Sequence, residues 1–150
     1  MKQLIFFSLL LITVFTACSV LTLQPANFAW PLESVLKVDD EGKVSEDRYS
    51  VEFNTKAMFF EEFQDSLAFI DKEIRLIRND LGYYFITSSN FKNVYVFKGV
   101  EGKMILENKI FISDFGLQIP ALNQREPFIE LVDGSNKMNL THEGIEGGEE

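Results

Sequence analysis

Apolar and polar residues alternate along several short stretches of the chain, a pattern typical of β-strands. In residues 49–54, aromatic or aliphatic residues occupy every second position, as in a strand with one buried face and one solvated face. Residues 34–38 and 44–53 flank residues 39–42 (DDEG), where acidic residues suit the first turn positions and glycine permits a positive φ. The pattern predicts a hairpin between these two segments.

The same arrangement recurs twice further along the chain. A turn sequence NDLG separates residues 73–78 from residues 83–87, and GVEG separates residues 93–98 from residues 103–112. Consecutive strands that are joined by tight turns pair antiparallel. These segments therefore predict an antiparallel meander.

The C-terminal third of the chain has weaker patterns. Residues 116–123 contain Pro120 and are expected to form a loop. Residues 127–132 are expected to form the last strand, at a sheet edge because the segment begins with proline. Residues 134–150 are rich in glycine and acidic residues, so burial cannot offset the entropy of ordering them. We expect a flexible acidic tail there.

A helical period replaces the strand pattern in the middle of the chain. Apolar residues recur there at offsets of three and four, which predicts one amphipathic helix. Helices that lie on a membrane surface usually carry Lys and Arg on their polar face, whereas this polar face includes Glu61 and Glu62. The acidic face favours packing of the helix against the sheet. The apolar positions are Met58, Phe59, Phe60, Phe63, Leu67 and Ile70.

These elements together predict a mainly β fold, either all-β or α+β. The antiparallel meander would form a small sandwich or a partly open barrel with one packed amphipathic helix. The length of 150 residues fits a single domain. We place the β domain at residues 32–133.

The N-terminus has the three parts of a secretory signal peptide. Lys2 provides a basic start, residues 4–14 form an apolar run, and residues 16–17 are small and precede Cys18. The apolar run is shorter than the roughly 20 residues that a transmembrane helix needs. Residues 1–17 are therefore expected to be removed as a signal peptide.

Residues 15–18 (FTAC) resemble the lipobox of bacterial lipoproteins. The resemblance implies that the Cys18 thiol receives a diacylglycerol, that the chain is cut before Cys18, and that the new amino group is acylated. Residues 18–31 would then be a lipidated cysteine and a linker, held on a bilayer by several acyl chains. Ser19 stands where aspartate retains proteobacterial lipoproteins in the inner membrane, which implies an outer-membrane protein facing the periplasm of a Gram-negative bacterium. An ordinary secreted protein with a cysteine near its cleavage site is the alternative.

Charge and residue counts exclude several classes of function. A net charge of -9 and a pI near 4.6 argue against nucleic-acid binding. Cys18 and His142 are the only residues of their types, so one chain cannot form an internal disulfide, a Cys/His zinc site or a Cys-His catalytic pair. Removal of residues 1–17, which carry one lysine and no acid, would change the charge to -10. We expect no metal site and no cofactor.

Carboxylates remain as candidates for chemistry. A pair of carboxyl groups is what glycoside hydrolysis requires. However, acids in a turn such as residues 39–42, or on the outer face of a helix, usually serve solvation, and the turn lacks the ligand spacing of a Ca²⁺ loop. A carboxylate-dependent glycan hydrolase is thus an alternative that the sequence leaves open.

Two predicted strands, residues 83–87 and 93–98, are apolar or aromatic on both faces. Such strands are typical of the centre of a sheet that is covered on both sides. The alternative is that one face stays open as a partner or ligand surface. The residues of that candidate surface are Tyr83, Phe85, Tyr95 and Phe97.

One short motif suggests a modification. Residues 65–67 (DSL) resemble the O-glycosylation motif of Bacteroidetes, in which aspartate is followed by serine or threonine and an aliphatic residue. The resemblance makes Ser66 a candidate for O-glycosylation. Leu67 also belongs to the predicted helix, which would place Ser66 on that helix.

The sequence thus favours a non-enzymatic lipoprotein of the cell envelope that binds a partner protein or helps to assemble an envelope complex. Its predicted partners are the lipid bilayer, through acylated Cys18, and an envelope protein. A carrier of a small apolar ligand is the first alternative, and the glycan hydrolase is the second.

Overall fold

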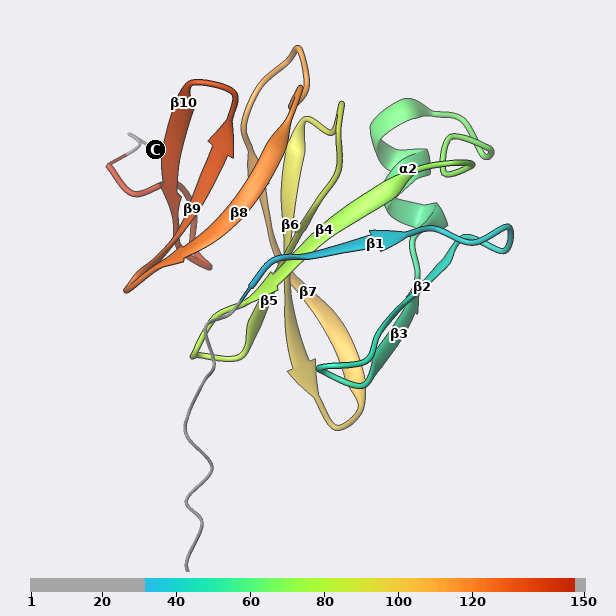
Figure 1. The fold of residues 1–150 in the computed structure, drawn as a ribbon, viewed down its shortest axis with the longest axis horizontal. Helices are drawn as coiled ribbons and strands as arrows, with labels where there is room; N and C mark the ends of the chain where they lie inside the picture. Colours follow the sequence, from blue (N-terminus) through green and yellow to red (C-terminus); the bar gives the residue numbers. More distant parts are fainter. Residues whose placement is uncertain (1–31, 148–150) are drawn as a thin grey trace, which may run out of the picture.

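Three antiparallel sheets and one short helix make up residues 32–147, the part of the chain that the computed structural model describes (Figure 1). The largest sheet has five strands, in the order β1 (Ser34–Lys37), β4 (Glu73–Arg78), β5 (Tyr83–Thr87), β6 (Asn93–Val100) and β7 (Lys103–Phe111). A second sheet has the order β10 (Asn136–Leu140), β9 (Phe128–Asp133) and β8 (Pro120–Arg125). The third is a hairpin of β2 (Lys43–Glu46) and β3 (Val51–Asn54), which leads into helix α2 (Lys56–Phe63).

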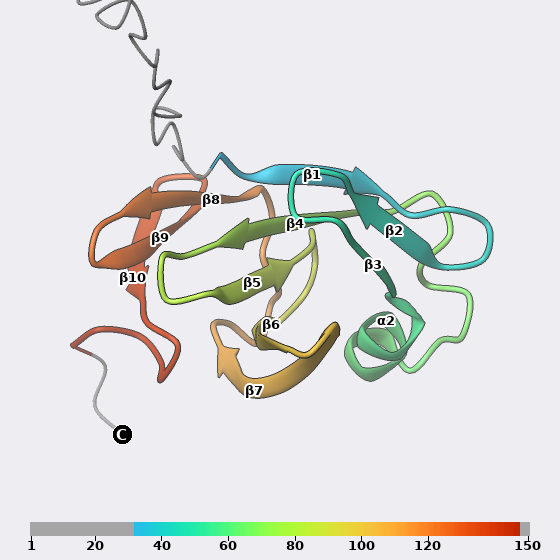
Figure 2. The ribbon, with the colours of Figure 1, turned by 90° about the horizontal axis from the view of Figure 1, so that it is seen from below.

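The five-stranded sheet forms the middle layer of the domain. Figure 2 shows β8–β10 on one side of it and the β2–β3 hairpin with α2 on the other. Strands β5 and β6 are apolar on both faces because each face packs against one of these outer layers. The prediction of a mainly β fold with one helix is confirmed, and within residues 32–147 the sheets form a layered sandwich and no closed barrel.

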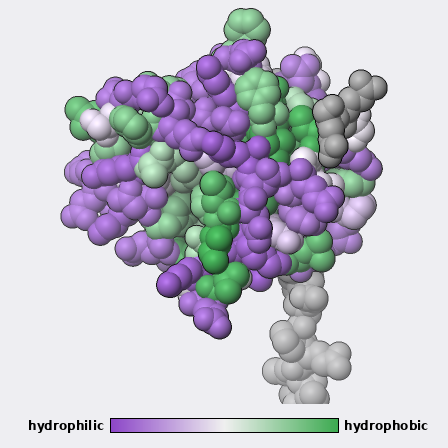
Figure 3. All heavy atoms as spheres, turned by 180° about the vertical axis from the view of Figure 1, so that it is seen from behind, coloured by the Kyte–Doolittle hydropathy of each residue, from purple (hydrophilic) through white to green (hydrophobic). Residues whose placement is uncertain are grey.

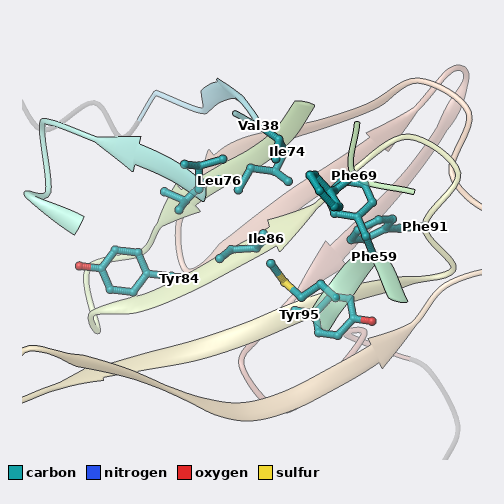
Figure 4. Packing of buried hydrophobic residues seen from close by; sticks show 11 residues of the cluster. Val38, Phe59, Phe69, Ile74, Leu76, Tyr84, Ile86, Phe91 and Tyr95 are labelled. Carbon is teal, nitrogen blue, oxygen red and sulfur yellow. The ribbon is translucent and has the colours of Figure 1, made fainter. Parts of the chain in front are cut away.

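One core lies between the five-stranded sheet and the α2 side. Phe59 from the helix meets Phe91 edge-on with ring centroids 4.9 Å apart, and Phe91 meets Tyr95 at 5.9 Å (Figure 4). Edge-to-face pairs of this kind stabilise a core beyond the area that they bury. The core's buried members are Val38, Val44, Met58, Phe59, Phe69, Ile74, Leu76, Tyr84, Ile86, Phe91 and Tyr95.

A second core lies between the opposite face of the sheet and β8–β10. It fills the space with branched aliphatic residues around Phe85, which is fully buried. Close packing of this kind makes the loss of even one side chain costly. The buried members are Ile77, Phe85, Val94, Val96, Ile110, Leu117, Leu122, Ile129, Leu131 and Leu140.

Glu62 fixes the helix to the sheet. Its carboxylate accepts hydrogen bonds from the Lys92 amide (2.7 Å), the Asn93 side chain (2.8 Å) and the Tyr95 hydroxyl (3.0 Å). Burial, and then the adjacent Glu62 charge, raises the pKa of Tyr95 well above its usual value. The expectation that Glu62 only solvates the outer face of the helix is therefore wrong, whereas Glu61 is exposed and pairs with Lys109.

Glu33 ties the start of the described chain to two sheets. Its carboxylate accepts hydrogen bonds from the Arg75 guanidinium on β4 (2.7 Å) and from the Leu122 amide on β8 (2.9 Å). Burial raises the pKa of Glu33, although both of these hydrogen bonds act in the opposite direction. Glu33 therefore joins β4 to β8 at the start of the described residues.

Strands β4 to β7 confirm the predicted meander. The turn after β4 closes with a hydrogen bond from the Gly82 amide to the Asn79 carbonyl (3.0 Å), and Gly82 has the positive φ of 82° that the sequence pattern anticipated. In the next hairpin Val100 pairs with Lys103, and the register continues to Asn93 and Phe111 with one shift after Val96. Local turn signals were sufficient for these four strands.

The first predicted hairpin is wrong. The turn at residues 39–42 forms, with the Asp39 carboxylate accepting hydrogen bonds from the Glu41 and Lys43 amides. However, β1 pairs with β4, and β2 pairs with β3 through a second turn at residues 47–50 that divides the segment predicted as one strand. Ser50 adopts a positive φ of 50° in that turn. The alternation of buried and exposed residues predicted for residues 49–54 therefore begins only at β3.

The helix is shorter than predicted. It ends at Phe63 because Gln64 adopts the left-handed conformation, with φ 55° and ψ 27°, and closes the last turn onto the Phe60 carbonyl. The Asp65 carboxylate then accepts a hydrogen bond from the Leu67 amide in a separate turn. Leu67 and Ile70, predicted on the buried stripe, are 61% and 49% exposed.

Two C-terminal predictions are also wrong. Residues 120–123, placed in the loop of residues 116–123, belong to β8, and residues 136–140, placed in the flexible tail of residues 134–150, form β10. As a consequence β9 lies at the centre of its sheet and is neither the last strand nor an edge strand. The segment orders because Leu140 is buried and Met138 and Ile145 pack against the same core. Residues 148–150 lie outside the described part of the chain.

The predicted signal peptide (1–17) and linker (18–31) also lie outside the described residues. Within residues 32–147, no helix has both the length and the apolar character needed to cross a bilayer.

Candidate functional site

The four aromatic residues predicted to share an open face do not share one. In the pairing of β5 with β6, Tyr95 lies opposite Ile86 and Phe97 lies opposite Tyr84, so both point toward the α2 side. Tyr83 and Phe85 point to the other side, toward β8–β10. Phe85 and Tyr95 are 0% and 1% exposed, and each face is covered. The prediction of one open surface from these residues is wrong because the register pairs odd-numbered residues of β5 with even-numbered residues of β6, for example Phe85 with Val96.

The other candidate residues lie apart from one another. Ser66 is exposed in the turn that follows α2, and its O-glycosylation stays a prediction. Cys18 lies outside the described residues. His142, expected in the tail, stacks on the Tyr83 ring at a centroid distance of 4.3 Å, and its carbonyl accepts a hydrogen bond from Asn108. It therefore helps to hold the end of the chain against the sheet.

A groove opens where three hairpin turns meet, between the β2–β3 hairpin and the five-stranded sheet. We call it the hairpin-end groove. Its volume is about 850 Å³, it is open to solvent, and both polar and apolar side chains line it. It is lined by Tyr49, Ser50, Val51, Glu52, Phe53, Arg78, Leu81, Gly82, Tyr84, Lys98, Gly99, Val100, Glu101, Gly102, Lys103 and Met104.

The three turns that form the groove follow from local sequence. Residues 79–82 and 99–102 are the glycine-ended turns that the sequence predicted, and Glu101 and Gly102 have the paired positive φ angles of a tight hairpin turn. Residues 47–50 form the turn that the sequence did not reveal. Because the turns belong to different hairpins, only tertiary packing brings them together.

Arg78 lies at the centre of the groove, on two tyrosine rings. Its guanidinium carbon is 5.5 Å from the centroid of Tyr84 and 5.9 Å from that of Tyr49. The two rings meet edge-on at 5.8 Å. A guanidinium held against aromatic rings is oriented without losing its five N–H donors. Burial raises the pKa of Tyr49, so its ring stays neutral.

A polar cluster holds the turn that carries Tyr49. Glu46 accepts hydrogen bonds from the Arg48 amide (3.0 Å) and the Arg48 side chain (2.9 Å), and Arg48 also contacts the Ser34 hydroxyl. Burial opposes ionisation of Glu46, but the hydrogen bonds from Arg48 and Ser34 outweigh it and lower the pKa of this carboxyl. A charged Glu46 therefore fixes the wall of the groove that faces Arg78.

A second cation, Lys98, lies near Gly82 but reaches it from the other face of the sheet, because Lys98 is opposite Tyr83 and Arg78 is opposite Tyr84. A methyl group built at Gly82 would lie 3.5 Å from an Arg78 nitrogen and 3.8 Å from the Lys98 ammonium nitrogen. Both charged tips thus lie within 4 Å of the position that a Cβ at residue 82 would take. Lys98 also donates to the Leu81 carbonyl and lies 3.9 Å from the Tyr83 centroid, so its position is fixed from two sides.

The charges of the groove differ from those of the whole chain. Its lining has three basic residues, Arg78, Lys98 and Lys103, and none of them forms an ion pair within residues 32–147. Glu101 is exposed at the hairpin tip. Glu52, the other acid of the lining, alternates with the core-packed residues of β3 and is exposed. The groove therefore has a surplus of positive charge on a chain of net charge -9.

Metal ligands are not gathered in the described part of the chain. Within residues 32–147, no three His, Cys, Asp or Glu side chains lie close enough together to hold a metal ion. The groove can instead bind through guanidinium and ammonium hydrogen bonds and through apolar contacts.

Sequence reasoning missed Arg78, Tyr49 and Lys98 as site residues. Arg78 and Lys98 each lie beside a predicted turn, and basic residues at the ends of neighbouring strands were the available signal. Basic residues at strand ends indicate a site only when the turns beside them are known to lie at the same end of the sheet, which the sequence does not show.

Comparisons with protein-family models, with curated proteins and with solved structures found no match. The function therefore has to be inferred from the chemistry of the groove and from the signals in the sequence.

Proposed function

We propose that the protein is a non-enzymatic lipoprotein of the cell envelope whose β domain binds a partner protein in the hairpin-end groove. The observation that carries the proposal is the groove itself, where exposed Arg78 and Lys103 and half-buried Lys98 lie beside apolar residues. Exposed sites that combine arginine, tyrosine and apolar side chains are typical of protein interfaces. Acylated Cys18 would tether this binding site to the bilayer.

The location of the tether follows the sequence signals. Cleavage before Cys18 would leave a linker that ends near residue 32, where Glu33 joins the domain. Ser19 favours the outer membrane, facing the periplasm of a Gram-negative bacterium. There the groove would meet other envelope proteins at short range, and the tether would raise their effective concentration.

The groove favours partner binding over the two alternatives. A carrier of a small apolar ligand needs an enclosed apolar cavity, whereas this groove is open and has charged walls. A glycan hydrolase needs two carboxyl groups held close together in one cleft, whereas the two glutamates that line this groove, Glu52 on β3 and Glu101 in the β6–β7 turn, are both exposed and come from different hairpins. An open groove with charged walls and exposed glutamates suits a surface that recognises another molecule.

Site-specific photocrosslinking tests the proposal. A photoreactive amino acid at Leu81 or Val100, which line the groove and are 64% and 44% exposed, is expected to give one discrete crosslinked species in intact envelopes. The matched control positions are Leu67 and Ile119, which are 61% and 70% exposed away from the groove. Crosslinks of equal yield from all four positions, or none from the groove, would overturn the proposal.

A further inference from the structure

We propose that the hairpin-end groove binds an extended acidic peptide segment of its partner, with a carboxylate of that segment on Arg78. The inference rests on the proposed function and deepens it by naming the chemistry of the partner. It draws on three features of the described residues, which are the exposed Arg78 guanidinium with Lys98 nearby, the covered aromatic faces and the free edge of β7.

The cations define the position of the carboxylate. The Arg78 guanidinium lies on Tyr49 and Tyr84, and the Lys98 ammonium lies on the other side of Gly82, near the Tyr83 ring. Within residues 32–147, Arg78 makes no ion pair, so its fork of N–H donors is available to a ligand. Bidentate pairing with a carboxylate is the interaction for which this geometry is best suited.

The acidic surface of the rest of the protein does not prevent this contact. At physiological ionic strength the Debye length is about 8 Å, so charges far from the groove are largely screened. Arg78 and Lys98 act at hydrogen-bonding distance, where screening is weak. The remote acids instead disfavour acidic molecules elsewhere on the surface, which restricts the peptide to the groove.

The aromatic rings favour a peptide over an acidic sugar. A sugar ring needs a bare aromatic face on which to stack, but Arg48 and Arg78 both lie over the Tyr49 ring, at 5.5 Å and 5.9 Å. Tyr84 is 7% exposed and is covered by Arg78. The apolar residues that remain exposed beside the cations, Leu81 and Val100, are suited to aliphatic side chains of a peptide.

The free edge of β7 leads out of the groove. Within residues 32–147, β7 pairs with β6 alone, and its first residues, Lys103 and Met104, line the groove. Ile105 and Leu106 follow at 50% and 46% exposure. The view from behind shows hydrophobic residues in a strip low on the molecule, where the β6–β7 hairpin lies (Figure 3).

An extended peptide can pair with such an edge through its main chain. Side chains in the second half of β7 already contact other elements, since Lys109 pairs with Glu61 and Asn108 donates to the carbonyls of His142 and Glu143. The accessible portion is thus the one next to the groove. A partner segment would place its acidic side chain on Arg78 and continue along Lys103–Leu106.

Binding of defined peptides to the purified full chain in detergent tests the inference. The probes are a fluorescent peptide of alternating glutamate and valine, its glutamine counterpart and trigalacturonate. The glutamate peptide is expected to bind. The Arg78→Gln variant is expected to bind this peptide about tenfold more weakly, because it loses a charge-assisted bidentate contact.

Lys98→Gln is expected to weaken binding by a smaller factor and provides a second variant in case Arg78→Gln disturbs the fold. Lys72→Gln, at an exposed lysine outside the groove, is the matched control and is expected to leave affinity unchanged.

Three results would overturn the inference. They are equal affinity for the glutamate and glutamine peptides, unchanged binding in the Arg78→Gln and Lys98→Gln variants, and tighter Arg78-dependent binding of trigalacturonate than of the peptide. Crosslinks from Leu81 and Val100 together with any of these results would leave partner binding intact while rejecting the acidic peptide. Absence of those crosslinks would reject the partner-binding proposal itself.

Discussion

Replacing Leu140 with alanine is expected to lower the free energy of unfolding by about 3 kcal/mol, because the change leaves a cavity in a packed core. Leu140 is 1% exposed and lies opposite Ile129 in the pairing of β10 with β9. The core that it fills also contains Leu131, and β10 covers one edge of its sheet. Urea titration of the purified full chain measures the effect.

Lys137→Ala is the matched control for this variant. Lys137 lies on the same strand with its side chain 62% exposed, 3.7 Å from the Glu130 carboxylate. Exposed ion pairs contribute little, so this variant is expected to unfold within about 0.5 kcal/mol of the parent. A Leu140→Ala protein as stable as the Lys137→Ala protein would show that residues 136–140 do not pack on the domain.

Replacing Cys18 with alanine is expected to abolish acylation of the protein and its recovery with membranes. The thiol is the proposed site of the diacylglycerol, and loss of the acyl chains removes the buried methylenes that hold the protein on the bilayer. Incorporation of a labelled fatty acid and membrane fractionation measure the two effects. Ser19→Ala, one residue away, is the control and is expected to remain acylated. A Cys18→Ala protein that still carries label and sediments with membranes would contradict the anchor.

The parts of the fold that the sequence predicted are those that depend on neighbouring residues. Strands β4 to β7 follow from glycine-ended turns and from period-two alternation, both of which act within a few residues. The pairing of β1 with β4 spans most of the first half of the domain, and a turn at residues 39–42 that looks like a hairpin carries no information about it.

The errors near the C-terminus have a related cause. Asp133 and Gly134 precede an alternating segment in which Met138 and Leu140 are apolar, and this weak signal is hidden by the acidic composition of the tail. The ordering entropy of the segment is offset only because β9 and the second core already provide a surface. Composition alone therefore underestimates what a short strand can gain from a preformed neighbour.

The residues of the groove also could not be brought together from local sequence signals. Arg78, Tyr84 and Lys98 lie on predicted strands, but Tyr49 lies in a turn that sequence reasoning treated as strand. Alternation within a strand separates Tyr83 from Tyr84, but the sequence does not give the β5–β6 register that puts Phe97 on the face of Tyr84. Recognition of Arg78 as a central residue required the packing of the β2–β3 hairpin over the sheet.

Lysine labelling in intact envelopes tests the central claim, that the groove is occupied by a partner, most directly. Acylation rates of Lys98 and Lys103, which line the groove, are compared between envelopes and the purified protein, with Lys72 and Lys137 as exposed controls outside it. We expect labelling of Lys98 and Lys103 to be several-fold slower in envelopes and labelling of the control lysines to be equal in the two preparations. Equal ratios at all four lysines would contradict the account.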